Sequence, residues 1–280
     1  MRYINYNGNI YSEHEHLLPV TNRAFRYGDG FFESMVMFDR KIPLLEFHWS
    51  RLQFTIEVLN GTLPKRFDEQ KLFSMILDLA SVNGALKNAR IRVQFFRKGD
   101  GLYLPDTDEF GYSISIEKIE NEKFECGNGL TVGIREDCFK AATLFSDLKH
   151  SSALPYVMAA QFAKHENWGD MILLNHFAQL CESINSNIFL VTKNKIVTPN
   201  IDSGCVNGVM RSYLISELEE EIEEREVEEK ELKEADEILL TNAVKGVQWV
   251  RTFQSRSYEN KKAVELTAFL NKNLLEKLSS

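Results

Sequence analysis

The sequence predicts an α/β protein built from two domains. The chain has 280 residues, which is enough for one large domain or two of ordinary size. Short segments with alternating apolar residues are interleaved with segments of helical periodicity. The polar stretch "EKIENEKFECGNG", near residues 119–128, separates two halves that each contain both kinds of segment. We therefore expect an N-terminal α/β domain over residues 1–122 and a C-terminal α/β domain over residues 123–280.

The first half is expected to contain a mostly antiparallel sheet and two helices. "YINYNGNIY" alternates around Asn7-Gly8, which is typical of a tight hairpin. "FFESMVMF" and "KIPLL" indicate a second strand pair. "LEFHWSRLQFTIEVLNG" predicts a helix that ends at Gly61, and residues 68–85 predict another. The alternating segments "RIRVQFFR" and "YSISIEKI" predict two more strands.

The second half is expected to repeat this mixture of strands and helices. Strands are predicted at "LTVGIR", "MILLN", "SNIFLV" and "EILLT". Helices are predicted at about residues 154–167, after "VNGVMR", and from about residue 260. Much of the negative charge lies in "ELEEEIEEREVEEKELKEADE", which is more typical of a solvated helix and a following strand than of an acidic interaction surface.

Composition excludes several classes of partner. The net charge of −8 argues against nucleic acid. No stretch approaches the roughly 18 apolar residues of a membrane span, and the N-terminus has no apolar core of a signal peptide. Neither the six histidines nor the four cysteines have the spacing of metal ligands. The cysteines are therefore expected to be reduced thiols of a cytoplasmic protein; they are Cys126, Cys138, Cys181 and Cys205.

Arg51 stands out because it lies in an apolar stripe of its predicted helix. That stripe contains Phe47, Arg51, Phe54 and Val58. Burying an unpaired guanidinium is unfavourable by several kcal/mol, so the side chain needs an anion. The anion can be an internal carboxylate, or the side chain can reach the surface instead. Because arginine binds phosphate in a fork, a phosphorylated ligand is the third alternative.

Three further features complement Arg51. "GCVNGVMR" places glycine and backbone amides at a predicted helix start, where phosphate is favoured, although Asn207 could be an ordinary cap. Lys149 lies among small residues in "DLKHSSALPYV", and Glu182 lies in "LCESINSNIFLV". Pyridoxal phosphate requires an amine for an imine, an acid for its ring nitrogen and a phosphate site. These residues are compatible with that cofactor, and also with surface positions.

Four motifs resemble those of one family. "NRAFRYGDGFFES", the Lys149 segment, "CESINSNIF" and "TPNIDSGCVNGVMR" are similar to the class IV aminotransferases, the fold-type IV pyridoxal-phosphate enzymes. These include branched-chain aminotransferases, D-amino-acid aminotransferases and 4-amino-4-deoxychorismate lyases. The resemblance runs from about residue 3 to residue 250. It implies the D-amino-acid-aminotransferase-like fold, with pyridoxal 5'-phosphate between two α/β domains, a small-molecule amine substrate and usually a homodimer.

The resemblance also implies roles for particular residues. Lys149 matches the Schiff-base lysine, carried by the C-terminal domain. Glu182 matches the carboxylate that faces the pyridine nitrogen, and Arg51 in "HWSRL" matches the phosphate-binding arginine. Further cofactor contacts are implied at Asn187, Gly208, Val209, Met210, Asn242 and Ala243. The surroundings of Lys149 are then small because they must admit a flat ring.

Within the family, the motifs look more like the lyases than the aminotransferases. Aminotransferases usually have a threonine where this chain has Met210, and a "G-T-A" triplet where it has "TNAV". "VNGVMR", "LKH" and "ADEILLTNA" resemble the lyases. Ser34 aligns with a lyase hydroxyl residue proposed to help move protons, whereas Glu33 resembles the "FE" of aminotransferases. A branched-chain or D-amino-acid aminotransferase is therefore the alternative.

Two residues are candidates for substrate binding. Arg97, at the end of "RIRVQFFR", would suit a substrate carboxylate. It is out of phase with Arg90 and Arg92, so it is expected on the other side of the sheet, where an ion pair would be the structural alternative. Tyr103 in "GLYLP" is a candidate pocket residue.

The resemblance implies a reaction whose first half is common to both activities. The substrate amine displaces Lys149, and the freed amine then removes the proton from the amine-bearing carbon. Glu182 keeps the ring nitrogen protonated, so the electrons spread into the ring. In a lyase they expel the enolpyruvyl oxygen, with Ser34 as a possible donor, and give pyruvate and an aromatic amine. In an aminotransferase, Lys149 returns the proton to the cofactor and a keto acid is released.

Overall fold

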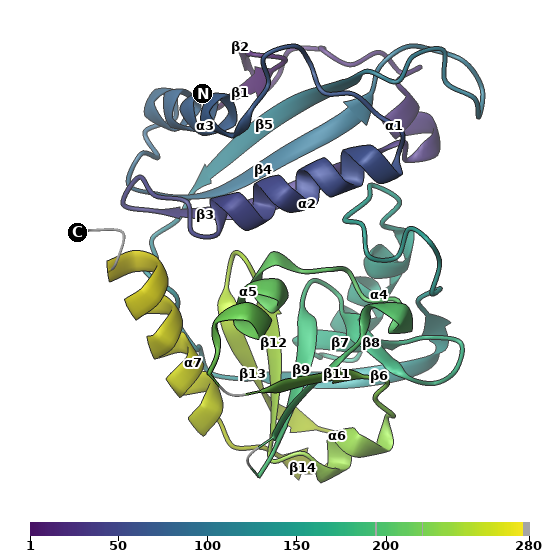
Figure 1. Cartoon of the computed structure of the whole chain (residues 1–280), viewed down its shortest axis with the longest axis vertical. Helices are drawn as coiled ribbons and strands as arrows, with labels where there is room; N and C mark the ends of the chain where they lie inside the picture. Colours follow the sequence, from purple (N-terminus) through teal and green to yellow (C-terminus); the bar gives the residue numbers. More distant parts are fainter. Residues whose placement is uncertain (194, 220, 277–280) are drawn as a thin grey trace. The chain divides into compact units, whose positions relative to one another are not determined.

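The computed structural model describes residues 1–193, 195–219 and 221–276. It divides into two compact units, which Figure 1 draws with their elements labelled. Unit 1 contains Met1–Glu122 together with the short segment Lys149–Ser152, and unit 2 contains the rest of the chain. The mixed α/β fold expected from the sequence is confirmed.

Unit 1 contains an antiparallel sheet of five strands in the order β2-β1-β5-β4-β3. The strands are β1 (Tyr3–Tyr6), β2 (Asn9–Ser12), β3 (Gly30–Phe38), β4 (Asn88–Arg97) and β5 (Phe110–Lys118). The predicted hairpin is confirmed, since β1 pairs with β2 across Asn7 and Gly8, which both have positive φ. The alternation of "RIRVQFFR" and "YSISIEKI" is also confirmed as the β4–β5 pair.

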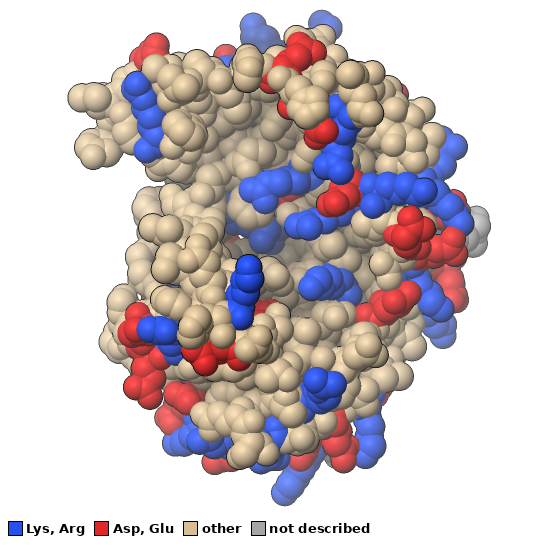
Figure 2. All heavy atoms as spheres, turned by 180° about the vertical axis from the view of Figure 1, so that it is seen from behind, with Lys and Arg blue, Asp and Glu red and all other residues tan. Residues whose placement is uncertain are grey.

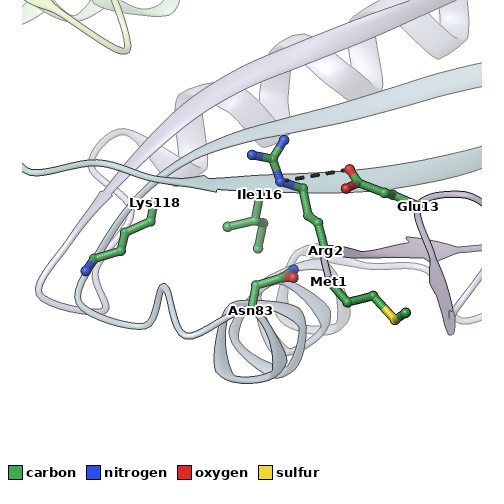
Figure 3. Close-up of a pocket in the computed structure, with 6 residues that line it drawn as sticks. All are labelled: Met1, Arg2, Glu13, Asn83, Ile116 and Lys118. Atoms are coloured by element: carbon green, nitrogen blue, oxygen red, sulfur yellow. Dashed lines mark ion pairs between the residues drawn. The ribbon is translucent and has the colours of Figure 1, made fainter.

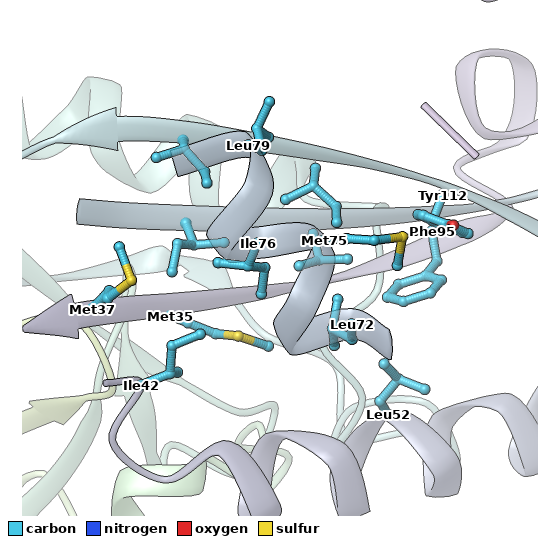
Figure 4. Close-up of a cluster of buried hydrophobic side chains, with 14 of the residues drawn as sticks. Met35, Met37, Ile42, Leu52, Leu72, Met75, Ile76, Leu79, Phe95 and Tyr112 are labelled. Atoms are coloured by element: carbon cyan, nitrogen blue, oxygen red, sulfur yellow. Dashed lines mark hydrogen bonds between the residues drawn. The ribbon is translucent and has the colours of Figure 1, made fainter. Parts of the chain in front are cut away.

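The core of unit 1 lies between this sheet and two helices. These are α2 (Leu45–Val58) and α3 (Glu69–Val82), which follow the short helix α1 (Arg23–Tyr27). Figure 4 shows Met35 of β3, Leu52 of α2 and Ile76 of α3 among the buried residues of this core. The odd-numbered residues of β3 therefore face the helices, and the even-numbered residues face the other side of the sheet.

Two details of unit 1 differ from the expectation. "KIPLL" is not a strand: a single bridge joins Phe38 to Lys41, and α2 then begins after Leu44. Leu44 has a φ of 62°, so the chain turns there instead of extending. The helix also ends at Val58, before Gly61, because Asn60 has a φ of 48° and already leaves the helical conformation.

Unit 2 contains a nine-stranded sheet. Its strands are β6 (Leu130–Phe139), β7 (Asp170–Leu174), β8 (Leu180–Ser183), β9 (Asn187–Thr192), β10 (Lys195–Pro199), β11 (Ile222–Arg225), β12 (Glu237–Asn242), β13 (Gly246–Phe253) and β14 (Arg256–Ser257). The main path is β11-β10-β9-β12-β13-β6-β7-β8, and β8 also pairs with β9. This last pairing joins Glu182 to Asn187, so β8, at the end of the strand order, is also hydrogen-bonded to β9 within it.

The helices of unit 2 are α4 (Leu154–His165), α5 (Val209–Glu217), α6 (Lys230–Glu234) and α7 (Lys261–Asn271), with a 3-10 turn at Ile201–Ser203 and a π-helical turn at Lys272–Glu276. The helices predicted near 154–167, after "VNGVMR" and from about 260 are confirmed. The prediction for the acidic run is wrong in its main part. After α5 ends, the run contains strand β11 and the short helix α6, because residues 222–225 pair with β10; Glu220 lies outside the described residues.

Lys149 was expected in the C-terminal domain, but its segment packs with unit 1. The amide of Phe32 donates to the carbonyl of Lys149 at 3.0 Å, and the amide of Ser151 donates to the carbonyl of Gly30 at 2.8 Å. These bonds continue the sheet beyond β3 and fix the lysine backbone to it.

Candidate active site

Lys149 lies over a face of the unit 1 sheet. Its Nζ is 4.9 Å from the ring centroid of Phe32, the second aromatic residue of "GDGFFES". Ser34 follows Phe32 by two positions and therefore projects from the same face of β3. An aromatic ring, a hydroxyl and the candidate reactive amine thus share one side of the sheet.

Arg51 is bound to Glu33 on the opposite face. Arg51 donates to the Glu33 carboxylate from Nε at 2.8 Å and from Nη2 at 2.6 Å. His48 Nδ1 contacts the same carboxylate at 2.6 Å. Since an ionised carboxylate only accepts hydrogen bonds, Nδ1 carries the proton. Nε2 of His48 is buried and has no partner among the described residues.

The Glu33 cluster has strongly perturbed acid–base properties. Burial alone would raise the pKa of Glu33, but Arg51 and His48 outweigh it and lower this pKa to about 2. Burial lowers the pKa of His48 despite the opposing effect of Glu33, and the charges of Arg51 and Lys149 lower it further. At neutral pH the cluster therefore contains an ionised Glu33 and a neutral His48.

The apolar stripe predicted around Arg51 is not the buried face of α2. The buried residues are His48, Leu52, Thr55 and Ile56, whereas Phe54 is 45% exposed. Only 8% of the Arg51 side chain is exposed, because its guanidinium forms an ion pair with Glu33 of β3. Of the alternatives for Arg51, an internal carboxylate is the partner observed.

Arg92 is a functional candidate that was not predicted from the sequence. Its guanidinium lies 3.7 Å from the centroid of the Phe32 ring, the same ring that Lys149 overlies. Arg92 pairs in register with Ser34 across the β3–β4 ladder. Burial, and then the charge of Arg90, lower the pKa of Arg92. An exposed guanidinium that lies against an aromatic ring is a suitable site for an anionic ligand.

Arg97 lies on the other side of β4, as its phase predicted, and is buried there. It donates to Asp29 at 3.2 Å and to the carbonyl of Leu59 at 2.7 Å. These contacts favour the structural ion pair over a substrate carboxylate. Tyr103 is 88% exposed in the loop between β4 and β5, where its ring contacts Tyr27.

In unit 2, Glu182 is held by donors from three other segments. Its Oε1 accepts from Lys140 Nζ and from Tyr156 OH, the latter at 2.6 Å, and its Oε2 accepts from the amide of Val206 at 2.9 Å. Glu182 itself is only 3% exposed. Burial, and then the charge of Glu182, raise the pKa of Tyr156. Neither Lys140 nor Tyr156 was predicted to be functional.

The start of α5 is an open helix terminus. Gly208 is the residue before its first turn, and it offers no side chain to cap the amides of Val209 and Met210. Asn207 does not occupy the capping position. A Cβ on Gly208 would lie 1.9 Å from Oδ1 of Asn187, whose Nδ2 donates to the carbonyl of Val206 at 2.7 Å. Only glycine fits here without displacing Asn187.

Asn242 and Ala243 lie where β12 turns into β13. Asn242 donates to Ser186 Oγ at 2.9 Å, and its Oδ1 accepts from the amides of Val244 and Lys245. The Asn242 side chain therefore stabilises this turn.

Other features of the described residues can be compared with these candidates. Among the described residues there is no cluster of metal-binding side chains, no helix that could span a bilayer, and each of the four cysteines is a free thiol. On the face shown in Figure 2, basic and acidic side chains are interspersed. A pocket of about 390 Å³ in unit 1, shown in Figure 3, contains none of the candidate residues. It is lined by Met1, Arg2, Glu13, Asn83, Ile116 and Lys118.

The donor set fits pyridoxal 5'-phosphate. Within unit 1 there is an amine at Lys149, and Arg51 is bound to Glu33; within unit 2 there is a buried carboxylate at Glu182 and the uncapped start of α5. These are the groups that bind an aldehyde, a phosphate and a ring nitrogen. The Asn187 side chain packs directly against Gly208, so the backbone at the start of α5 has no room for a Cβ.

Comparisons with known proteins agree with this class of enzyme. The profile of the amino-transferase class IV family matches residues 30–253, so the chain belongs to this family of pyridoxal-phosphate enzymes. It is 31% identical to the probable branched-chain-amino-acid aminotransferase of Thermotoga maritima, over 81% of this chain and 78% of that protein. It is 24% identical to the aminodeoxychorismate lyase of Vibrio harveyi, over 82% and 85%.

Solved structures share the fold. The branched-chain aminotransferase of Thermoproteus uzoniensis with norvaline matches with a TM-score of 0.87 at 18% identity, over 99% of this chain and 95% of that one. The holo-form branched-chain aminotransferase of Thermobaculum terrenum matches with a TM-score of 0.82 at 19% identity, over 98% and 94%. The predicted fold, family and cofactor are thereby confirmed.

Proposed function

We propose that this enzyme is a 4-amino-4-deoxychorismate lyase, which releases pyruvate and leaves 4-aminobenzoate, a folate precursor. The substrate divides into these two products with all atoms accounted for, so neither a keto acid nor an oxidant is needed. We further propose that it acts as a homodimer in the cytoplasm.

The observation that carries this proposal is the position of Ser34. It shares the β3 face with Phe32, whose ring is 4.9 Å from Lys149 Nζ. A hydroxyl on the side of the reacting amine is suited to protonate a leaving oxygen, a step that transamination does not include. The "VNGVMR" segment, with Met210 buried at the start of α5, supports the same activity.

Arg92 would bind a carboxylate of the substrate. It pairs in register with Ser34 and lies against Phe32, so a carboxylate on Arg92 would bring the substrate to the lysine face. Arg97 and Tyr103 are the candidates that the sequence indicates for this role. Arg97 is bound to Asp29, and Tyr103 would contribute only if its loop covered the substrate.

The remaining residues would hold the cofactor, which when bound supplies an electron sink for the carbanion. Lys149 would attach it covalently and then move the proton of the amine-bearing carbon. Arg51 and the start of α5 would bind the phosphate, and Glu182 would accept a hydrogen bond from the ring nitrogen. Asn187, Gly208, Val209, Met210, Asn242 and Ala243 would shape the phosphate side of this site.

The test is to incubate the cofactor-loaded enzyme with 4-amino-4-deoxychorismate and no keto acid, and to measure pyruvate and 4-aminobenzoate. We expect release of both in equal amounts, and no release by Lys149→Ala. Borohydride reduction followed by peptide mapping should place the cofactor on Lys149. An exposed lysine variant, Lys87→Ala, is the control. Loaded enzyme that forms neither product would contradict the lyase.

The second candidate is an aminotransferase for branched-chain or D-amino acids. It is favoured by the 31% identity to the Thermotoga maritima protein and by Glu33 in the "FE" pair. An aminotransferase must convert its cofactor between the aldehyde and amine forms in each catalytic cycle. Half-reactions with L- and D-amino acids, followed by absorption spectroscopy without a keto acid, distinguish it from the lyase.

A further inference from the structure

The carboxylate of Glu182 has one acceptor position left. An ionised carboxylate has about four such positions, two on each oxygen. Lys140 Nζ and Tyr156 OH fill those of Oε1, and the amide of Val206 fills one on Oε2. Within the described parts of the chain no fourth donor is found. The position that remains is therefore on Oε2.

We propose that Lys140 and Tyr156 are positioning residues that hold Glu182 ionised and thereby keep the shared proton on the cofactor ring nitrogen. The inference rests on the proposed function of Glu182 as the partner of that nitrogen. It adds two residues to the control of the electron sink: Lys140, which directly follows β6, and Tyr156 of α4.

The physical reason concerns where one proton resides. A proton between Glu182 and the ring nitrogen gives either a carboxylate and a charged ring, or a carboxylic acid and a neutral ring. Lys140 contacts Oε1, so its charge is closer to the carboxylate than to any base bound at Oε2. It therefore stabilises the carboxylate more than it destabilises the charged ring. Tyr156 acts in the same direction, because its hydrogen bond favours the ionised form.

The surroundings of Lys140 indicate that this contact is its main function. Lys140 is 6% exposed, and its Nζ also donates to the carbonyl of Ser146 at 3.1 Å. In the described structure Glu182 is its one acidic partner. A lysine is seldom buried without such a partner. Tyr156 remains a donor at high pH, because burial and the charge of Glu182 raise its pKa.

The experiment observes the ring nitrogen directly. Apoenzyme is loaded with pyridoxal phosphate labelled with ¹⁵N in the ring, and the ¹⁵N chemical shift is measured at neutral pH. The wild type should show a protonated nitrogen, and Glu182→Gln gives the unprotonated reference. Lys140→Met and Tyr156→Phe should move the shift toward that reference. The ratio of charged to neutral ring should fall by about tenfold, the effect of one pKa unit.

Two variants serve as controls. Lys140→Arg keeps a cation beside Glu182 and should retain the wild-type shift. Tyr258→Phe removes a buried hydroxyl that donates to the carbonyl of Leu232 at 2.9 Å, away from Glu182, and should also leave the shift unchanged. Thermal unfolding of each apoenzyme checks the fold. If Lys140→Met does not fold, Tyr156→Phe, which retains the ring, still tests the inference.

The outcomes separate this inference from the function of Glu182. If Glu182→Gln moves the shift while Lys140→Met and Tyr156→Phe keep the wild-type value, the inference is overturned and the role of Glu182 stands. If Glu182→Gln itself leaves the nitrogen protonated, Glu182 is not its partner and both fail. Movement in both variants, with rescue by Lys140→Arg, supports the inference.

Discussion

Glu33 accepts two hydrogen bonds from one edge of the Arg51 guanidinium, at 2.8 Å from Nε and 2.6 Å from Nη2, where the Glu33 side chain is 1% and the Arg51 side chain 8% exposed. These two hydrogen bonds join strand β3 to helix α2 within unit 1. They fix the orientation of the guanidinium before any ligand arrives. Preorganisation of this kind lowers the entropy lost when a phosphate binds.

Replacing Glu33 should destabilise unit 1. In Glu33→Ala the charge of Arg51 would remain buried without its partner, a change that typically lowers the free energy of unfolding by about 3–5 kcal/mol. Urea unfolding followed by circular dichroism measures the loss. Arg51→Met combined with Glu33→Gln removes both charges and should recover much of it. The exposed acid variant Glu13→Gln is the control. Equal stability of Glu33→Ala and wild type would show that the ion pair contributes nothing.

Stability should fall on acidification in two steps. The pKa of Glu33 is lowered from 4.5 to about 2, so its contribution is present above 4.5 and is lost as the pH falls toward 2. The pKa of His48 is also lowered, from 6.5, so the folded state binds fewer protons there and loses stability as the pH falls below 6.5. Unfolding free energies measured between pH 7 and pH 3 should show both slopes.

Variants of the two residues separate their steps. Glu33→Gln should remove the slope below about pH 4.5, and His48→Gln should flatten the slope that begins near pH 6.5. An acid profile identical to that of the wild type in both variants would contradict the assignment of these slopes.

Arg92 and Arg97 should respond differently to removal of charge. Arg97→Met breaks the bonds to Asp29 and to the Leu59 carbonyl and should lower the melting temperature. Arg92→Met should leave the melting temperature nearly unchanged but raise KM for the carboxylate-bearing substrate by about tenfold or more, the effect of one lost charged hydrogen bond. Steady-state kinetics and calorimetry of both variants test this. The reverse pattern would return the substrate role to Arg97.

The local elements were predictable because their signals are local. The Asn7-Gly8 turn, the alternation of β4 and β5, and the Asp68 start of α3 each depend on a few neighbouring residues. The acidic run failed for the opposite reason. Its charges suggested a solvated helix, but pairing with β10, which is distant in sequence, makes residues 222–225 an edge strand.

The site was predictable only in part. Lys149, Glu182 and Arg51 are candidates that the motifs indicate, whereas their partners come from tertiary contacts. Lys140 and Tyr156 are 42 and 26 residues from Glu182, and no local pattern links them. The phase of β4 separated Arg97 from Arg92, but phase alone does not tell which face carries the lysine. That depends on the hydrogen bonds of the Lys149 segment to β3.

Gly208→Ala should weaken cofactor binding without unfolding the enzyme. The new Cβ would lie 1.9 Å from Asn187 Oδ1, and this side chain is held by its bond to the Val206 carbonyl, so the start of α5 has to move. Overpacking of this kind typically costs about 1–3 kcal/mol, which corresponds to a rise of about 5- to 150-fold in the Kd for pyridoxal phosphate. Fluorescence titration of the apoenzyme measures it.

The matched control is Gly169→Ala, where φ is not positive and the nearest atom, Leu130 Cδ2 at 3.0 Å, is the end of a flexible side chain. Its Kd should stay near that of the wild type. Removing the obstructing amide in Gly208→Ala combined with Asn187→Ala should restore part of the affinity if the clash is the cause. If Gly208→Ala binds the cofactor as tightly as the wild type, the start of α5 does not contact the phosphate. The phosphate would then have to be bound by side chains such as Arg51.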